Sequence, residues 1–131
     1  MYYGVSNMRK LGLLTLILNL SGVCFASELD SKIISVNGHQ IHYYQSGTKG
    51  SPVVLLTGYA TTSNFWPRDF VGCLASSHQV YLIDYRGINT SESIVASELT
   101  LKSMADDTNA VVAKLKLKNP ALIGWSMGGG V

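Results

Sequence analysis

Three short apolar runs, separated by segments long enough to form helices, constrain the fold of this chain most strongly. Residues 53–56, 80–83 and 121–123 are almost wholly apolar. A continuous apolar run is typical of a strand that is covered on both faces, as strands in parallel sheets are. The sequence therefore predicts an α/β fold in which parallel strands are joined by helical crossovers.

An Asn-Gly pair near the start of this region predicts a β-hairpin. Asn37 and Gly38 stand between two β-prone runs, residues 32–36 and 40–45. A two-residue hairpin turn needs positive φ at both central positions, which Asn and Gly tolerate best. The hairpin is expected to precede the parallel strands.

Two segments between the apolar runs have helical character. One lies within residues 64–76, and the other covers residues 101–115, whose apolar residues recur at near-helical spacing. Thr100 is placed to cap the second helix, with Ser103 at the position where a reciprocal cap would stand. The expected order is a hairpin followed by a βαβαβ unit.

The pentapeptide Gly124-Trp125-Ser126-Met127-Gly128 follows the third apolar run directly. A G-x-S-x-G sequence between a strand and a helix is typical of a nucleophile elbow, in which a strained serine exposes its Oγ. Glycines at positions 124 and 128 let the strand and the helix pack closely. The backbone N–H of Met127 would then be able to donate to an oxyanion.

The chain resembles the α/β-hydrolase superfamily over roughly residues 33–131. The resemblance is carried by the hairpin, by the strand and turn ending in Thr57-Gly58-Tyr59, by residues 84–87 (Asp-Tyr-Arg-Gly), and by the elbow at Ser126. These features look like the first half of an esterase, lipase or aminopeptidase-type member.

This resemblance implies nucleophilic acyl transfer with Ser126 as the nucleophile. An ester or amide of a small molecule would acylate the serine, and water would release the acyl group. The second oxyanion donor would be the backbone N–H of Tyr59, beside that of Met127, while the side chains of Tyr59, Phe65 and Trp66 would shape an apolar acyl site. No metal or organic cofactor is implied.

Two positions depart from the usual pattern of the family. Thr57 replaces a common histidine, and we expect its hydroxyl to hydrogen-bond within the loop. Asn89 replaces a glycine after residues 84–87, and asparagine tolerates left-handed φ better than other non-glycine residues. Asp84 is expected to brace the loop through Arg86 and backbone groups, not to act as the catalytic acid.

The first 26 residues have the features of a signal peptide. Arg9 and Lys10 precede an apolar run at residues 11–20, and Ala26 ends a pattern that favours cleavage before Ser27. Ten residues are too few to cross a bilayer, which needs about 20. We therefore expect an exported protein, periplasmic or secreted, without a stable membrane anchor after cleavage; an uncleaved N-terminal anchor is the alternative.

Composition narrows the choice of partners. Apolar residues make up 47% of the chain and charged residues 14%, which excludes a disordered chain. If Arg9 and Lys10 are removed with the signal peptide, eight basic and eight acidic residues remain, and the formal net charge is zero. A formally neutral chain has no general field for polyanions, so nucleic acid is not an expected partner.

In the family the triad follows the order Ser, Asp or Glu, then His. His39, His42 and His78 all precede Ser126, so none matches the catalytic base, and we expect all three to be structural or exposed. Residues 27–131 are thus expected to be the N-terminal half of the domain, truncated and inactive as given. The alternatives are a non-catalytic α/β-hydrolase-like domain that binds a ligand or partner, and an acyltransferase on the same fold.

Overall fold

A computed structural model describes residues 28–89, 91 and 94–131 as a sheet with helices on both sides. The predicted signal peptide, residues 1–26, lies outside the described residues. The elements follow in the chain as β1 (Asp30–Val36), β2 (His39–Ser46), β3 (Pro52–Leu56), the 3₁₀-helix η1 (Ser63–Phe65), α1 (Arg68–Ala75), β4 (Gln79–Ile83), the 3₁₀-helix η2 (Ala96–Glu98), α2 (Leu101–Lys114), β5 (Ala121–Gly124) and the 3₁₀-helix η3 (Ser126–Gly130).

The sheet has five strands in the order β1-β2-β4-β3-β5. The hairpin strand β2 pairs antiparallel with both β1 and β4, whereas β4, β3 and β5 run parallel. The predicted hairpin followed by a βαβαβ unit is thus confirmed. At the hairpin turn both Asn37 and Gly38 adopt positive φ, of 49° and 80°.

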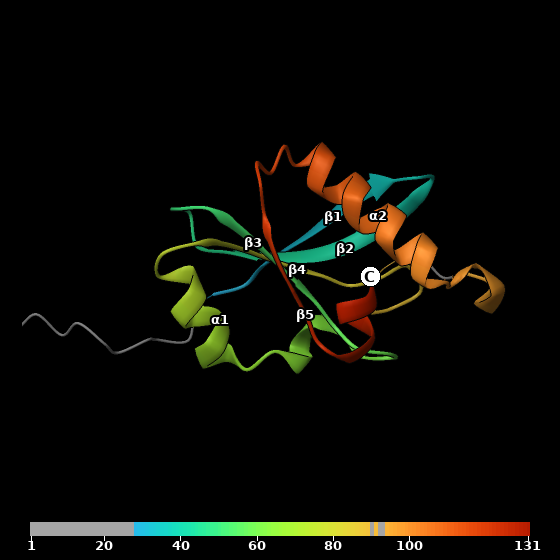
Figure 1. The fold of residues 1–131 in the computed structure, drawn as a ribbon, viewed down its shortest axis with the longest axis horizontal. Coiled ribbons are helices and arrows are strands. Elements are labelled where there is room, and N and C mark those ends of the chain that lie inside the picture. Colours follow the sequence, from blue (N-terminus) through green and yellow to red (C-terminus); the bar gives the residue numbers. More distant parts are fainter. Residues whose placement is uncertain (1–27, 90, 92–93) are drawn as a thin grey trace, which may run out of the picture.

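The order of the parallel strands places the two helices on opposite faces. The chain moves from β3 to β4 in one direction and then returns across β3 to reach β5. Since such crossovers are right-handed, the reversal sends α1 and α2 to different sides of the sheet. Figure 1 shows α2 above the sheet and α1 below it.

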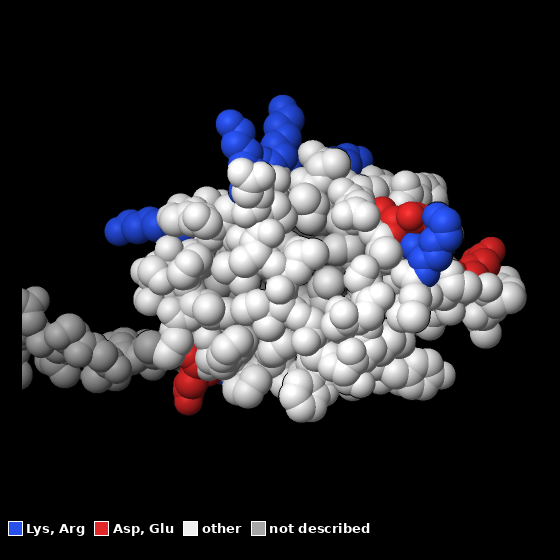
Figure 2. Space-filling view, in the orientation of Figure 1, with Lys and Arg blue, Asp and Glu red and all other residues white. Residues whose placement is uncertain are grey.

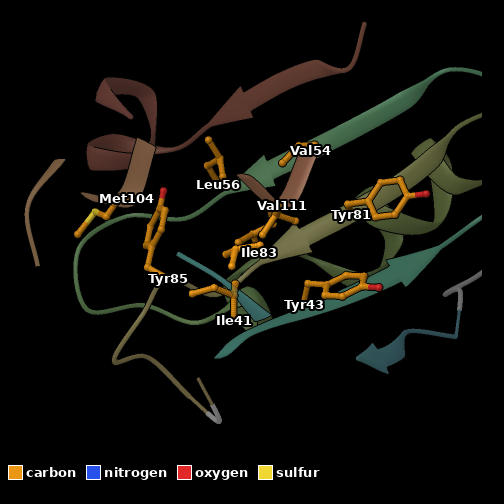
Figure 3. Packing of buried hydrophobic residues seen from close by; sticks show 10 residues of the cluster. Ile41, Tyr43, Val54, Leu56, Tyr81, Ile83, Tyr85, Met104 and Val111 are labelled. Carbon is orange, nitrogen blue, oxygen red and sulfur yellow. The ribbon is translucent and has the colours of Figure 1, made fainter. Parts of the chain in front are cut away.

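Each face has its own apolar cluster. Under α2 the buried side chains of Met104 and Val111 pack against residues of the central strands, among them Ile41, Val54 and Ile83, as Figure 3 shows. Under α1 the buried Val71 packs with the alternate residues Leu55 and Leu82 and with Trp66. This explains why β3 is apolar throughout: neighbouring residues serve opposite faces, and all five are buried.

The second helix begins with the reciprocal cap that the sequence indicates. The Thr100 hydroxyl accepts from the backbone N–H of Ser103, and the Ser103 hydroxyl accepts from the N–H of Thr100. The first helix lies within the predicted residues 64–76: it runs from Arg68 to Ala75 with Pro67 as its N-cap, and a 3₁₀ turn at Ser63–Phe65 precedes it.

One expectation near the end of the chain is wrong. The apolar strand β5 is not buried: Leu122 is 57% exposed, because within the described residues β5 lies at the sheet edge and pairs only with β3. The expected helix after the elbow is present from Ser126 to Gly130, in the form of a 3₁₀-helix. Three of its five residues are glycine, which destabilises an α-helix.

The part of the chain that the structure describes contains no helix that is long and apolar enough to span a membrane. Figure 2 shows a face on which Lys, Arg, Asp and Glu stand mainly around the rim, with uncharged residues between them.

Candidate active site

The candidate site lies where the carboxyl ends of β3 and β5 meet. These strands stand on either side of the point at which the strand order reverses, and ligands of open α/β sheets bind at such points. The parallel pairing ends with Leu56 opposite Gly124. One further bond continues it, from the Trp125 N–H to the Leu56 carbonyl oxygen at 3.0 Å.

Ser126 stands at this edge in a strained conformation. Its φ is 53°, in the left-handed region that non-glycine residues seldom adopt, and its side chain is exposed. A left-handed serine costs on the order of 1 kcal/mol, and such strain often marks a functional position.

The two glycines of the pentapeptide allow the turn to be this tight. A Cβ on Gly128 would stand 2.5 Å from the carbonyl oxygens of Leu56 and Thr57, and a Cβ on Gly124 would overlap the backbone of Gly128. The first turn of η3 is therefore pressed directly against the end of β3. This close packing fixes the direction in which Ser126 leaves the sheet.

The loop after β3 passes beside the serine. A Cβ on Gly58 would lie only 3.3 Å from the Ser126 Cβ. The Thr57 hydroxyl donates to the carbonyl oxygen of Thr61 at 3.3 Å, and the Thr61 hydroxyl donates to that of Gly58 at 3.0 Å. The hydrogen bond expected within the loop for Thr57 is thus present.

Tyr59 and Met127, whose backbone N–H groups are the predicted oxyanion donors, follow Gly58 and Ser126 in the chain. The Tyr59 side chain is 74% exposed, while that of Met127 packs against the cluster beneath α2. Beneath the loop the buried hydroxyl of Tyr85 donates to the Thr57 carbonyl oxygen at 3.3 Å. Burial raises the pKa of Tyr85 to about 12.

An aromatic pocket of about 280 Å³ opens next to the elbow and is lined by Phe65, Trp66, Pro67, Phe70 and Trp125. The rings are in contact: the centroids of Phe65 and Trp125 are 5.5 Å apart, and Trp66 stacks on Phe70 at 5.6 Å. The expected apolar site therefore exists with Phe65 and Trp66, but Tyr59 does not line it.

Asp84 is fully buried and holds the segment that follows β3 at Ser63. One carboxylate oxygen accepts from the N–H and the hydroxyl of Ser63, at 2.6 and 2.7 Å. The other lies 2.7 Å from the Asn89 amide nitrogen and 3.1 Å from Nδ1 of His42. The bracing role expected of Asp84 is confirmed, and Asn89 adopts the expected left-handed φ, at 56°.

Arg86 does not take part in that bracing, contrary to the expectation. Its guanidinium makes a bidentate pair with the buried Asp107 of α2, with both N–O distances at 2.7 Å. Hydrogen bonding to Asp107 raises the pKa of Arg86. The arginine therefore ties α2 to the loop after β4, and a neighbouring contact with Nε2 of His39 at 3.1 Å ties it to the hairpin.

The histidines have different surroundings. His42 is buried between Asp84 and Ser31, a connection that the sequence analysis missed because 42 residues separate His42 from Asp84. His78 lies next to Ser77, whose hydroxyl is 2.9 Å from Nδ1. Within the described residues, no three His, Cys, Asp or Glu side chains are grouped to hold a metal ion.

Residues 51–131 match the family model described as the alpha/beta hydrolase fold. A putative non-heme chloroperoxidase of Synechocystis is 32% identical over 88 residues, which are 67% of this chain and 32% of that protein. An N-formylmaleamate deformylase of Pseudomonas putida is 32% identical over 72% of this chain and 35% of its own length. The chain thus spans about a third of these relatives.

Solved structures agree with this match. The epoxide hydrolase CorEH superposes with a TM-score of 0.71 at 30% identity, covering 78% of this chain and 35% of that one. A bacterial membrane phospholipase A superposes with a TM-score of 0.72 at 22% identity over 77% of this chain and 33% of that chain, which supports the fold alone. Together with the elbow geometry, these matches show that the chain belongs to the alpha/beta hydrolase fold family.

Proposed function

We propose that this chain carries the nucleophile of a serine hydrolase that cleaves an ester or amide bond. Ser126 attacks the carbonyl carbon of the substrate, and the leaving group departs from an acyl-serine that water then hydrolyses. This mechanism also needs a histidine that takes the serine proton and an acid that orients the histidine. The single observation that carries the proposal is the left-handed, exposed Ser126 at the end of β5.

The backbone N–H groups of Tyr59 and Met127 are the proposed donors to the oxyanion. Both follow residues that lie against each other, since Gly58 stands beside Ser126. Main-chain donors held by a hydrogen-bonded loop need no reorganisation when charge develops, and the loss of one such donor typically costs about 10²–10³ in kcat.

The aromatic pocket favours an apolar acyl group. It opens next to Ser126 through Trp125 and holds no charged side chain among its lining residues. One relative is named a deformylase, and removal of a formyl group is an acyl transfer, which supports this reaction class. We therefore propose p-nitrophenyl butyrate as a better substrate than p-nitrophenyl acetate.

Residues 1–26 are proposed to be a signal peptide that directs export. The test is the mass of the protein recovered from outside the cytoplasm of an expressing bacterium. A mature chain that begins at Ser27 supports the proposal, and a chain that retains Arg9 and Lys10 contradicts it.

The proposed activity is tested by hydrolysis of p-nitrophenyl butyrate by the protein encoded by the complete reading frame. Ser126→Ala should lower kcat/KM by about 10⁴-fold or more, as the loss of a triad nucleophile does. Ser97→Ala, at an exposed serine of η2, is the matched control and should retain full activity. Undiminished hydrolysis by Ser126→Ala would contradict the proposal, and transfer of the butyryl group to an added alcohol in preference to water would reassign the enzyme as an acyltransferase.

A further inference from the structure

A second serine, remote from the elbow in the chain, lies at the end of a hydrogen-bonded Ser-His-Asp series. The Oγ of Ser31 on β1 is 2.8 Å from Nε2 of His42 on β2, and Nδ1 of the same ring is 3.1 Å from a carboxylate oxygen of Asp84. This is the arrangement by which an activated serine is recognised: a nucleophile next to a base that a third group orients. Such arrangements are identified by geometry and not by chain order.

The surroundings of His42 select the tautomer that a general base needs. The Asp84 carboxylate, which only accepts hydrogen bonds, lies 3.1 Å from Nδ1 and favours a neutral imidazole with its proton on Nδ1. The Asn89 amide nitrogen also lies 3.2 Å from Nδ1, but it donates to the same carboxylate oxygen at 2.7 Å. With the proton on Nδ1, the lone pair of Nε2 faces Ser31. Tyr44 packs edge-on against the ring, with centroids 4.5 Å apart, and helps to fix its plane. Asp84 and Tyr44 are the titratable side chains that these contacts place against the imidazole.

The series runs from the interior to the surface. Asp84 and His42 are buried, at 0% and 3% exposure, while Ser31 is exposed. Ser31 also lines an open groove of about 510 Å³ between residues 28–32 and 45–48. The residue is therefore open to solvent.

Within the described residues β1 is an outer strand of the sheet, and an outer strand presents unpaired backbone N–H groups that can stabilise a carbonyl oxygen as it becomes negative.

We infer that Ser31 is a second nucleophile, which accepts the acyl group of small, activated esters such as aryl acetates. Its Oγ bonds to the ester carbonyl carbon while its proton moves to Nε2 of His42. The ester C–O bond then breaks, and the same proton leaves with the aryl alcohol. In hydrolysis of the acyl-serine, water gives a proton to Nε2 and its oxygen takes the acyl group, after which Ser31 regains the proton. Asp84 is a positioning residue in both steps.

The test is acetylation of the 131-residue chain carrying Ser126→Ala, which removes the elbow serine from the reaction. After brief exposure to p-nitrophenyl acetate and acid quenching, peptide mass spectrometry measures acetylation at Ser31. Ser35, an exposed serine four residues later in the same strand, is the internal reference. General-base assistance should make Ser31 react on the order of 10²-fold faster than Ser35. Equal reaction of the two serines overturns the inference.

Two further measurements separate chemistry from structure. His42→Gln should reduce acetylation of Ser31 to the rate of Ser35, with circular dichroism reporting whether the fold is retained. In the chain that keeps His42, the acetylation rate of Ser31 should rise with pH and then level off, as general-base catalysis does. A rate that instead rises continuously with hydroxide concentration overturns the inference, whether or not His42→Gln folds. Neither result bears on Ser126.

Discussion

Gly58 lies against Ser126, so closely that a Cβ at position 58 would stand 3.3 Å from the serine Cβ and 3.4 Å from Cδ1 of Trp125. The loop that would bind the oxyanion and the turn that carries the proposed nucleophile are therefore in contact. A change at either one is transmitted to the other.

This contact predicts that Gly58→Ala harms activity more than stability. The backbone of Gly58 does not need positive φ, and its neighbours would have to move only by a few tenths of an ångström. We expect kcat/KM of the complete enzyme for p-nitrophenyl butyrate to fall about tenfold, since small misplacements of reacting groups are costly. The free energy of unfolding should change by less than about 1 kcal/mol. A loss of stability without loss of kcat/KM would contradict the reasoning.

Gly128→Ala should destabilise the fold by about 2–3 kcal/mol, because the added methyl group would meet the carbonyl oxygens of Leu56 and Thr57 at 2.5 Å. Gly130→Ala is the matched control in the same 3₁₀-helix, since a Cβ there has no neighbour within 4 Å. Urea unfolding of both variants checks the expectation. Similar midpoints for the two would show that the elbow is not packed against β3 as described.

Much of this architecture could be predicted from local sequence. Asn37-Gly38 predicts the hairpin, the apolar runs predict β3 and β4, and Thr100 with Ser103 predicts the start of α2. These predictions succeed because turn, burial and capping preferences depend on a few neighbouring residues. The elbow at Ser126 could be predicted for the same reason, because both of its glycines lie within two residues of the serine.

Contacts between distant residues could not be predicted in this way. His42 and Asp84 are 42 positions apart in the sequence. Arg86 pairs with Asp107 and not with Asp84, because α2 places the Asp107 carboxylate next to the guanidinium group. The exposure of Leu122 on β5 likewise depends on which strands lie beside β5. An apolar run has the same sequence pattern in an edge strand as in a central strand.

Asp84→Asn should cost about 3 kcal/mol of stability. The substitution removes the carboxylate charge beside Ser63 and His42. In a buried hydrogen-bond network, the loss of one group leaves the polar atoms that it contacted unsatisfied. Asp106→Asn, which breaks an exposed pair with Lys102, should cost less than about 0.5 kcal/mol. Chemical denaturation at neutral pH compares them, and equal losses would argue against the bracing role of Asp84.

Tyr85 predicts a loss of stability in alkali. Burial raises its pKa from 10.0 to about 12 in the folded chain. Between these values the unfolded chain releases the phenol proton while the folded chain keeps it, so its contribution to stability, complete below pH 10, is lost as pH rises toward 12.

Tyr85→Phe isolates this effect. At pH 8 the variant should be less stable than the parent by about 1 kcal/mol, since it lacks the hydrogen bond to Thr57. At pH 12 the difference should vanish or reverse, because phenylalanine has no proton to lose. Unfolding free energies measured in urea at both pH values test this, and a constant difference would contradict it.

A fluorophosphonate probe applied to the protein from the complete reading frame tests whether Ser126 is the nucleophile. Such a probe phosphonylates activated serines, and mass spectrometry of the digested protein identifies the residue modified. The account predicts rapid, stoichiometric modification of Ser126, with loss of p-nitrophenyl butyrate hydrolysis in the same proportion. An enzyme that hydrolyses the ester while Ser126 stays unmodified, its activity falling with modification elsewhere, would contradict the account.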